Sequence, residues 1–189
     1  MPLNHPRSNS AGIYQIADCP TLPSQAPFTH TWAAELMPVL YEWWGTPAVL
    51  SALHASNYYL RWAATNQVGT MGEEASAVVP VFMEMLGEAD PGTRSGAADA
   101  LGKLGPPAVE AVPALMAALK DDENNVQFAV VRALGNIGPA AQDAVPMLIN
   151  LLDDPDYMFD IYAAEALVKI TGQGFGEDAQ AWRQWWNKK

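Results

Sequence analysis

Histidine and cysteine, the side chains that most often bind metals or act as nucleophiles, are scarce in this chain. The three histidines are His5, His30 and His54, and none of them lies in an HExxH motif or in a His-Glu pair. The single cysteine, Cys19, lies in a proline-rich stretch without a neighbouring base. A zinc site needs several clustered ligands, and a nucleophilic cysteine needs a group that lowers its pKa. The sequence therefore predicts no catalytic residue, no metal site and no cofactor.

Phosphate binding is not indicated by the glycines either. Gly172, Gly174 and Gly176 form the cluster nearest to a phosphate-binding motif, but they follow a predicted helix rather than a strand. A glycine-rich phosphate loop joins a strand to a helix. We therefore expect a flexible turn before the last helix.

Acidic residues are the most prominent charged feature, and they recur in groups just before predicted helices. The groups are Glu88 and Asp90, then Asp121, Asp122 and Glu123, then Asp153, Asp154 and Asp156. A carboxylate at this position accepts hydrogen bonds from free N–H groups of the first turn and is favoured by the helix dipole. The spacing does not match a calcium-binding loop. We interpret these residues as helix caps, with an acidic docking strip as the alternative.

The net charge argues against several classes of partner. The 189 residues include 21 acidic and 10 basic side chains, which gives a formal net charge of −11. Residues 72–189 carry 18 of the acidic and eight of the basic side chains. Nucleic acids and anionic membranes require a positive surface, so neither is expected as a partner. The single cysteine and the absence of an apolar run or signal-like N-terminus are typical of a cytoplasmic protein.

An internal repeat of 33 residues sets the positions of the helices. Residues 96–119 (GAADALGKLGPPAVEAVPALMAAL) align without a gap with residues 129–152 (AVVRALGNIGPAAQDAVPMLINLL). An earlier copy, residues 63–86, fits the same register, and residues 162–171 begin a further one. Repeats of this length are typical of solenoids.

Each copy predicts two helices of about a dozen residues, each with one buried face. On the first helices of successive copies, the expected buried stripes are Ala97/Leu101/Leu104, then Val130/Leu134/Ile137, then Ala163/Leu167/Ile170. On the second helices they are Val79/Phe82/Met83/Leu86, then Val112/Leu115/Met116/Leu119, then Val145/Leu148/Ile149/Leu152. Pro80, Pro113 and Pro146 should lie in the first turn of the second helices. Such short pairs must stack on their neighbours, so the predicted fold class is all-α, an α-α superhelix.

Residues 46–187 resemble HEAT repeats, specifically the short bacterial kind named for phycobilisome lyases. The resemblance is carried by AADALGKLGPPAVEAVPALMAALKDD and VVRALGNIGPAAQDAVPMLINLLDDPD. This kind usually has an arginine at the start of its first helix, which Arg61 and Arg94 match. Gln127 and Asp160 depart from the pattern, so we expect an Arg–Asp ladder between repeats to be broken there. The resemblance implies a helical scaffold.

The predicted organisation is a tail followed by one repeat domain, residues 29–189. Its parts are a Pro-rich arm (1–28), a degenerate first repeat (29–56), repeats 57–89, 90–122 and 123–155, and a C-terminal capping repeat (156–189). Tryptophans gather at both ends, namely Trp32, Trp43 and Trp44, and Trp182, Trp185 and Trp186. Large aromatics can close the ends of a solenoid, and the alternative is that they form a contact surface for a partner or for a second copy of the chain.

A partner is expected on the concave face, which second helices line in HEAT-like stacks. The candidate binding residues are Val81, Glu84, Met85, Ala114, Ala117, Ala118, Met147, Asn150 and Leu151, with Glu88, Asp121 and Asp154 at the edge. This acidic trough of small and soft apolar side chains suits a peptide with basic residues beside apolar anchors. The alternative is that the alanines are present only as good helix formers.

A second apolar line on the first helices runs through Trp62, Phe128 and Ile161 and is broken by Ser95. We expect it toward the convex side, either as a shielded ridge or as a homodimer contact. The leading functional hypothesis is a non-catalytic scaffold that binds a protein or peptide. From the resemblance, the alternative is a chaperone-like bilin lyase component that holds a tetrapyrrole and a client protein.

Overall fold

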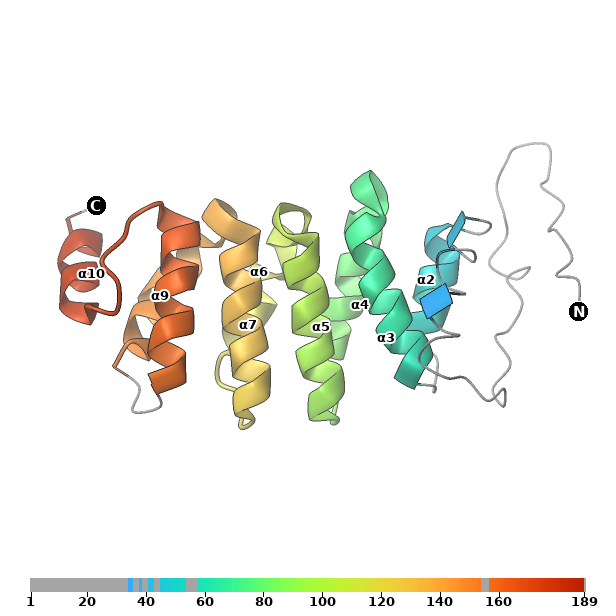
Figure 1. The fold of residues 1–189 in the computed structure, drawn as a ribbon, viewed down its shortest axis with the longest axis horizontal. Coiled ribbons are helices and arrows are strands. Elements are labelled where there is room, and N and C mark those ends of the chain that lie inside the picture. Colours follow the sequence, from blue (N-terminus) through green and yellow to red (C-terminus); the bar gives the residue numbers. More distant parts are fainter. Residues whose placement is uncertain are drawn as a thin grey trace, which may run out of the picture. The chain divides into compact units, whose positions relative to one another are not determined.

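The computed structural model describes residues 34–35, 38, 41–42, 45–53, 58–153 and 157–188. The regular elements in these ranges are helices, and the fold is an α-α superhelix of stacked helix pairs (Figure 1). The chain forms two compact units, residues 1–78 and 79–189. The following predicted features lie outside the described residues: the arm 1–28, Trp32, Trp43, Trp44, His5, His30, His54, Cys19, Asp154 and Asp156.

Within residues 45–53 and 58–78 of the N-terminal unit, the structure has two α-helices and two 3₁₀ segments. They are α2 (Thr46–Leu53), α3 (Tyr58–Gln67), η2 (Val68–Thr70) and η3 (Gly72–Val78). Helix α2 packs on α3 and buries Ala48, Val49, Ala52 and Leu53. The Thr46 hydroxyl donates a hydrogen bond to the Glu74 carboxylate, which ties α2 to η3.

The C-terminal unit repeats one pattern, a long helix followed by a 3₁₀ segment and a short helix. Its elements are α4 (Val79–Met85), α5 (Pro91–Leu104), η4 (Pro106–Ala111), α6 (Val112–Ala118), α7 (Asn124–Ile137), η5 (Gly138–Ala144), α8 (Val145–Leu151), α9 (Tyr157–Thr171) and α10 (Ala179–Trp186). The long helices α5, α7 and α9 lie side by side and form one layer (Figure 1). The short helices α4, α6 and α8 lie behind them and form the second layer.

The second element of each pair differs from the single helix that the sequence predicts. Pro113 and Pro146 are the second residues of α6 and α8, so they do lie in a first turn as predicted. Proline lacks the N–H and crowds the carbonyl four residues earlier, so an α-helix cannot extend backwards through it. The residues before it therefore form the 3₁₀ segments η4 and η5. Gly105 and Gly138, at φ 65° and 75°, end the preceding long helices.

Glycine–alanine contacts bring the long helices of the C-terminal unit close together. A Cβ atom on Gly102 of α5 would lie 3.0 Å from the Cα atom of Ala133 in α7. One repeat later, a Cβ atom on Gly135 would lie 2.9 Å from the Cα atom of Ala166 in α9. Real Cβ atoms essentially never come as near to a backbone as 2.9 Å, so Gly135 has no room for a side chain without a shift of α9, and the contact at Gly102 is nearly as tight. The same contact therefore recurs at the interval of the sequence repeat.

The last helix is held by an aromatic cluster. Trp182 of α10 has no exposed surface, and its indole Nε1 donates a 2.8 Å hydrogen bond to the Gly176 carbonyl. Phe175 and Trp185 both contact the Trp182 ring, at centroid distances of 4.9 and 6.0 Å. Helix α10 packs on α8. The burial of Trp182 supports a capping role, while Trp185 and Trp186 keep partly exposed surface.

Candidate binding groove

A groove lies between the short helices α4 and α6 of the C-terminal unit. It has a volume of about 370 Å³ and opens to solvent. Its lining residues are Met83, Leu86, Gly87, Ala114, Ala117, Ala118, Lys120 and Asp121. Most of these residues are apolar, and the two charged ones, Lys120 and Asp121, lie just beyond the end of α6.

Small side chains create this groove. Ala114, Ala117 and Ala118 project only a methyl group from α6, and Gly87, which follows α4, has no side chain. Phe82 of α4 and Leu115 of α6 do not line the groove and are fully buried. The hollow is therefore a surface feature that a partner side chain could enter. Helix propensity is a sufficient reason for the alanines in α6, and glycine is common just after the end of a helix such as α4.

The structure brings together part of the set that the sequence predicts. Ala114, Ala117, Ala118 and Asp121 line the groove. Six other predicted residues do not line the groove and are exposed or half-buried: Val81, Glu84, Glu88, Met147, Asn150 and Leu151. Asp154 lies outside the described residues. Whether a partner binds these residues stays a prediction.

Methionines 83 and 85 exchange the roles that the sequence predicts. Met85, expected on the open face, is 9% exposed and belongs to the core. Met83, expected in the buried stripe, is half-buried and lines the groove with Leu86. The short helix α4 packs on both α5 and η4. Its buried face is therefore Val79, Phe82, Met85 and Leu86, which is rotated from the predicted stripe.

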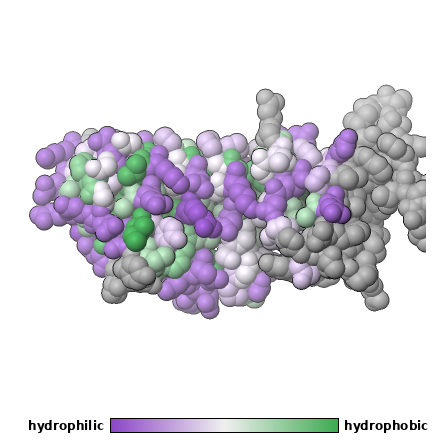
Figure 2. Space-filling model, viewed as in Figure 1, coloured by the Kyte–Doolittle hydropathy of each residue, from purple (hydrophilic) through white to green (hydrophobic). Residues whose placement is uncertain are grey.

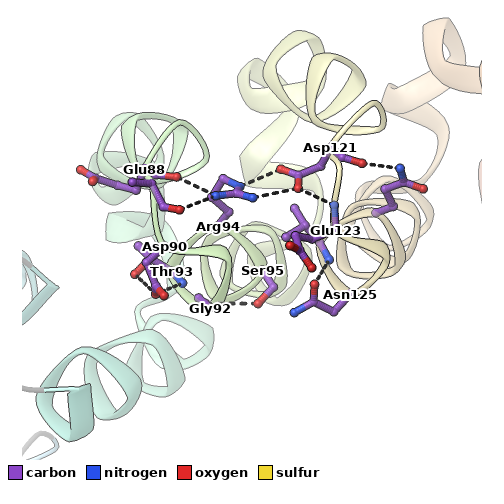
Figure 3. A network of polar contacts seen from close by, with 12 residues as sticks. Glu88, Asp90, Gly92, Thr93, Arg94, Ser95, Asp121, Glu123 and Asn125 are labelled. Atoms are coloured by element: carbon purple, nitrogen blue, oxygen red, sulfur yellow. Dashed lines mark hydrogen bonds and ion pairs between the residues drawn. The ribbon is translucent and has the colours of Figure 1, made fainter.

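Arg94 and Asp121 form a bidentate ion pair at the edge of the groove (Figure 3). The guanidinium Nε and Nη2 atoms donate to the two Asp121 carboxylate oxygens at 2.7 and 2.9 Å. The Nη1 atom also donates to the Glu88 and Ala89 carbonyls, each at 2.9 Å. Arg94 therefore connects the end of α4, its own helix α5 and the segment after α6. The two side chains are only 15% and 10% exposed, so the pair is shielded from water.

This pairing changes the electrostatics that the sequence predicts for the groove. The hydrogen bonds from Arg94 hold the pKa of Asp121 below its ordinary value, and the same contact raises the pKa of Arg94. Asp121 also accepts a 3.0 Å hydrogen bond from the Glu123 N–H. Because the negative charge of its carboxylate is already paired with Arg94, Asp121 positions the repeats rather than offering a free charge to a partner. Exposed charges near the groove are those of Lys120, Glu84 and Glu88.

The acidic groups before the helices divide into several roles. Asp90 caps α5 and accepts a 2.8 Å hydrogen bond from the Thr93 N–H, as the capping interpretation predicts (Figure 3). Glu123 precedes α7 without a side-chain cap. Asp153 instead pairs with Arg183 of α10. The sequence interpretation missed both the Arg183 pair and Asp178, whose carboxylate caps α10 at 2.9 Å from the Ala181 N–H.

The Arg–Asp contact does not recur as an ion pair at the next step of the repeat. Gln127 stands where Arg94 stands in the preceding copy, and its amide Nε2 donates to the Asp121 carbonyl. Asp160, the next equivalent, accepts from the N–H of Ile161 at 2.6 Å. The expectation for these two residues thus agrees with the observed contacts.

The described part of the chain offers no group of three or more His, Cys, Asp or Glu side chains that could hold a metal ion. Among the same residues, no helix has both the length and the apolar character required to cross a membrane.

Comparisons with known proteins agree with the helical architecture. A model of HEAT repeats matches residues 46–124 and 112–181. The complex of CpcE and CpcF of phycocyanin lyase from Nostoc sp. PCC7120 is similar in structure, with a TM-score of 0.61 and 20% identity over 100% of this chain and 74% of that chain. An engineered protein is similar with a TM-score of 0.56 and 24% identity over 72% of this chain and 66% of that chain, just under two thirds of its length. No curated protein matches the sequence.

Proposed function

Because the chain belongs to the HEAT repeat family, we propose that it is a non-catalytic scaffold that binds a protein or peptide along its short helices. The observation that carries this proposal is the apolar groove between α4 and α6. Its floor of alanine and glycine leaves room for a side chain, and its half-buried Met83 can adapt to the shape of an occupant. We also propose the repeat boundaries predicted from the sequence, with full repeats at residues 57–89, 90–122 and 123–155.

The occupant that fits best is a peptide with an apolar anchor and neighbouring basic residues. The anchor would fill the hollow over Ala114, Ala117 and Ala118, where desolvation of apolar surface supplies affinity. The exposed carboxylates of Glu84 and Glu88 provide partners for basic groups nearby. The acidic balance of residues 72–189 favours such a peptide over a nucleic acid or an anionic membrane. We also propose that the protein is located in the cytoplasm.

The substitution Ala117→Arg tests the assignment of the groove. Ala117 is exposed, so a long side chain can be accommodated without disturbing the core, and it would occupy the space of the anchor. Peptides selected on the wild-type protein from a random displayed library should lose most of their binding to this variant. The matched control is Ala140→Arg, which places the same side chain at an exposed alanine of η5 outside the groove.

Both variants should keep the wild-type far-ultraviolet circular dichroism, and only Ala117→Arg should weaken binding. Equal binding of the selected peptides to the two variants would show that the groove is not the docking site.

The second candidate function is that of a bilin lyase component. The supporting observation is the fold shared with the complex of CpcE and CpcF of phycocyanin lyase. A tetrapyrrole held by this chain would shift its visible absorbance on titration with the full-length protein. A spectrum equal to that of the free bilin in buffer would dismiss this alternative.

A further inference from the structure

Each of the long helices α5 and α7 contacts the next long helix of the C-terminal unit through side chains. Asp99 on α5 forms an ion pair with Arg132 on α7, 33 residues later. Asn136 on α7 accepts a 3.0 Å hydrogen bond from the Lys169 ammonium on α9, again 33 residues later. The Phe128 ring on α7 stacks on Phe159 of α9 at a centroid distance of 4.3 Å. Asp99 and Gly102 of α5, and Phe128 and Gly135 of α7, therefore lie toward the next long helix.

The corresponding outward face of α9 is exposed. One repeat step beyond Phe128, Arg132 and Gly135 are Ile161, Glu165 and Val168. Ile161 and Val168 are 39% and 42% exposed, and Glu165 is also exposed. Figure 2 shows strongly hydrophobic patches over α9, surrounded by more hydrophilic surface. We call these three residues the α9 outward face.

One residue of the α9 outward face distinguishes it from the faces of α5 and α7. Val168 stands where those helices have Gly102 and Gly135, the residues that permit close approach. A branched side chain there prevents another long helix from docking at the same short distance. The α9 outward face therefore suits a helix that packs on side chains rather than on backbone.

Charge indicates the chemistry of that helix. Glu165 lies between the two exposed apolar residues, and in the described part of the chain it has no ion-pair partner. At the same register, the carboxylate of Asp99 is met by an arginine from the neighbouring helix. An antiparallel second copy would bring Glu165 close to its own equivalent, and like charges repel. The complementary surface is therefore basic at its centre and apolar on both sides.

We propose that the α9 outward face is a second docking surface, separate from the groove, for an amphipathic helix of another protein. That helix places an arginine or lysine on Glu165 and apolar side chains against Ile161 and Val168. The three residues have the spacing of one helical face, i, i+4 and i+7, so one partner helix can contact all of them.

A stapled helical peptide provides the probe for this surface. It has alanine and glutamine as background, one central arginine and a leucine four residues to either side of it. Added to methyl-labelled full-length protein, it should shift the Ile161 and Val168 methyl resonances. Glu165→Lys should weaken binding about tenfold, because it replaces an attraction by a repulsion. A peptide with glutamate in place of arginine should bind this variant better than it binds the wild type.

Val109→Asp is the matched control, because Val109 is another exposed apolar residue and lies in η4. It should leave the titration unchanged, and so should the groove variant Ala117→Arg, which separates this proposal from the proposed function. Shifts that persist in Glu165→Lys, or their absence in the wild type, would overturn the proposal. Ile161 shifts that depend on protein concentration without peptide would identify a second copy as the occupant and would also overturn it.

Discussion

At the scale of single residues, the Arg94–Asp121 pair decides how the edge of the groove is built. One guanidinium satisfies two backbone carbonyls and both oxygens of one carboxylate, so α4, α5 and the segment after α6 meet at one side chain. A planar fork of donors makes this possible, and lysine could not reproduce it. An acidic residue that resembles a docking charge in the sequence thus has an internal partner.

The pair predicts a specific dependence of stability on pH. The pKa of Asp121 is lower in the folded protein than in the unfolded chain. Its stabilising contribution is therefore fully present above the ordinary aspartate pKa of about 3.9 and is lost as the pH falls through the lowered value. Asp121→Asn should lower the melting temperature at neutral pH, and its difference from wild type should shrink on acidification.

Melting curves of the wild type and of Asp121→Asn, recorded from about pH 7 to about pH 2, measure this dependence of stability on pH. Asp122→Asn is the control, since Asp122 is an exposed neighbour of the same type. A difference between Asp121→Asn and wild type that stays constant with pH would contradict the role of the charged pair.

At the scale of the elements, close packing of long helices depends on glycine at one register position. Gly102 and Gly135 allow backbone contact with Ala133 and Ala166, and this contact repeats along α5, α7 and α9. The short helices depend in turn on proline, which ends the α-helical hydrogen bonding and leaves 3₁₀ segments before them.

Two glycine-to-alanine substitutions should therefore have different effects on stability. Gly135→Ala puts a methyl group 2.9 Å from the Ala166 Cα atom, so the free energy of unfolding should fall by about 1–3 kcal/mol. Gly96→Ala in α5 meets no atom within 4 Å and should be neutral or stabilising, by up to about 1 kcal/mol. Urea denaturation of both variants and the wild type gives the comparison. Equal effects would show that the close approach is not a determinant of stability.

The helical repeat architecture could be predicted from the sequence because the regular spacing of a few residues is enough to define it. Landmarks such as Gly105 and Gly138, or Pro113 and Pro146, recur at one interval and end or begin helices by their own chemistry. The exchange between Met83 and Met85 could not be predicted in the same way, because both residues are apolar and two apart on a short helix. Which of them is buried depends on how α4 packs on α5 and η4. Likewise, the pairing of Asp121 depends on the long side chain of Arg94 reaching it from another helix.

At the scale of the whole molecule, the chain combines a HEAT repeat fold with a strongly acidic balance, at a formal net charge of −11. Its C-terminal unit has an apolar core without a buried polar or charged side chain among the described residues. What distinguishes this chain as a scaffold must therefore lie on the surface. The groove over α4 and α6 and the α9 outward face are the two apolar surfaces that we assign to partners.

The most direct test of the account follows the methionine methyl groups of full-length protein while a library-selected peptide is added. Met83 lines the groove, whereas Met147 lies on α8 and outside it. We predict that the Met83 resonance shifts in proportion to binding and that the Met147 resonance does not move. Saturable binding that shifts Met147 and leaves Met83 unchanged would contradict the assignment of the groove as the docking site.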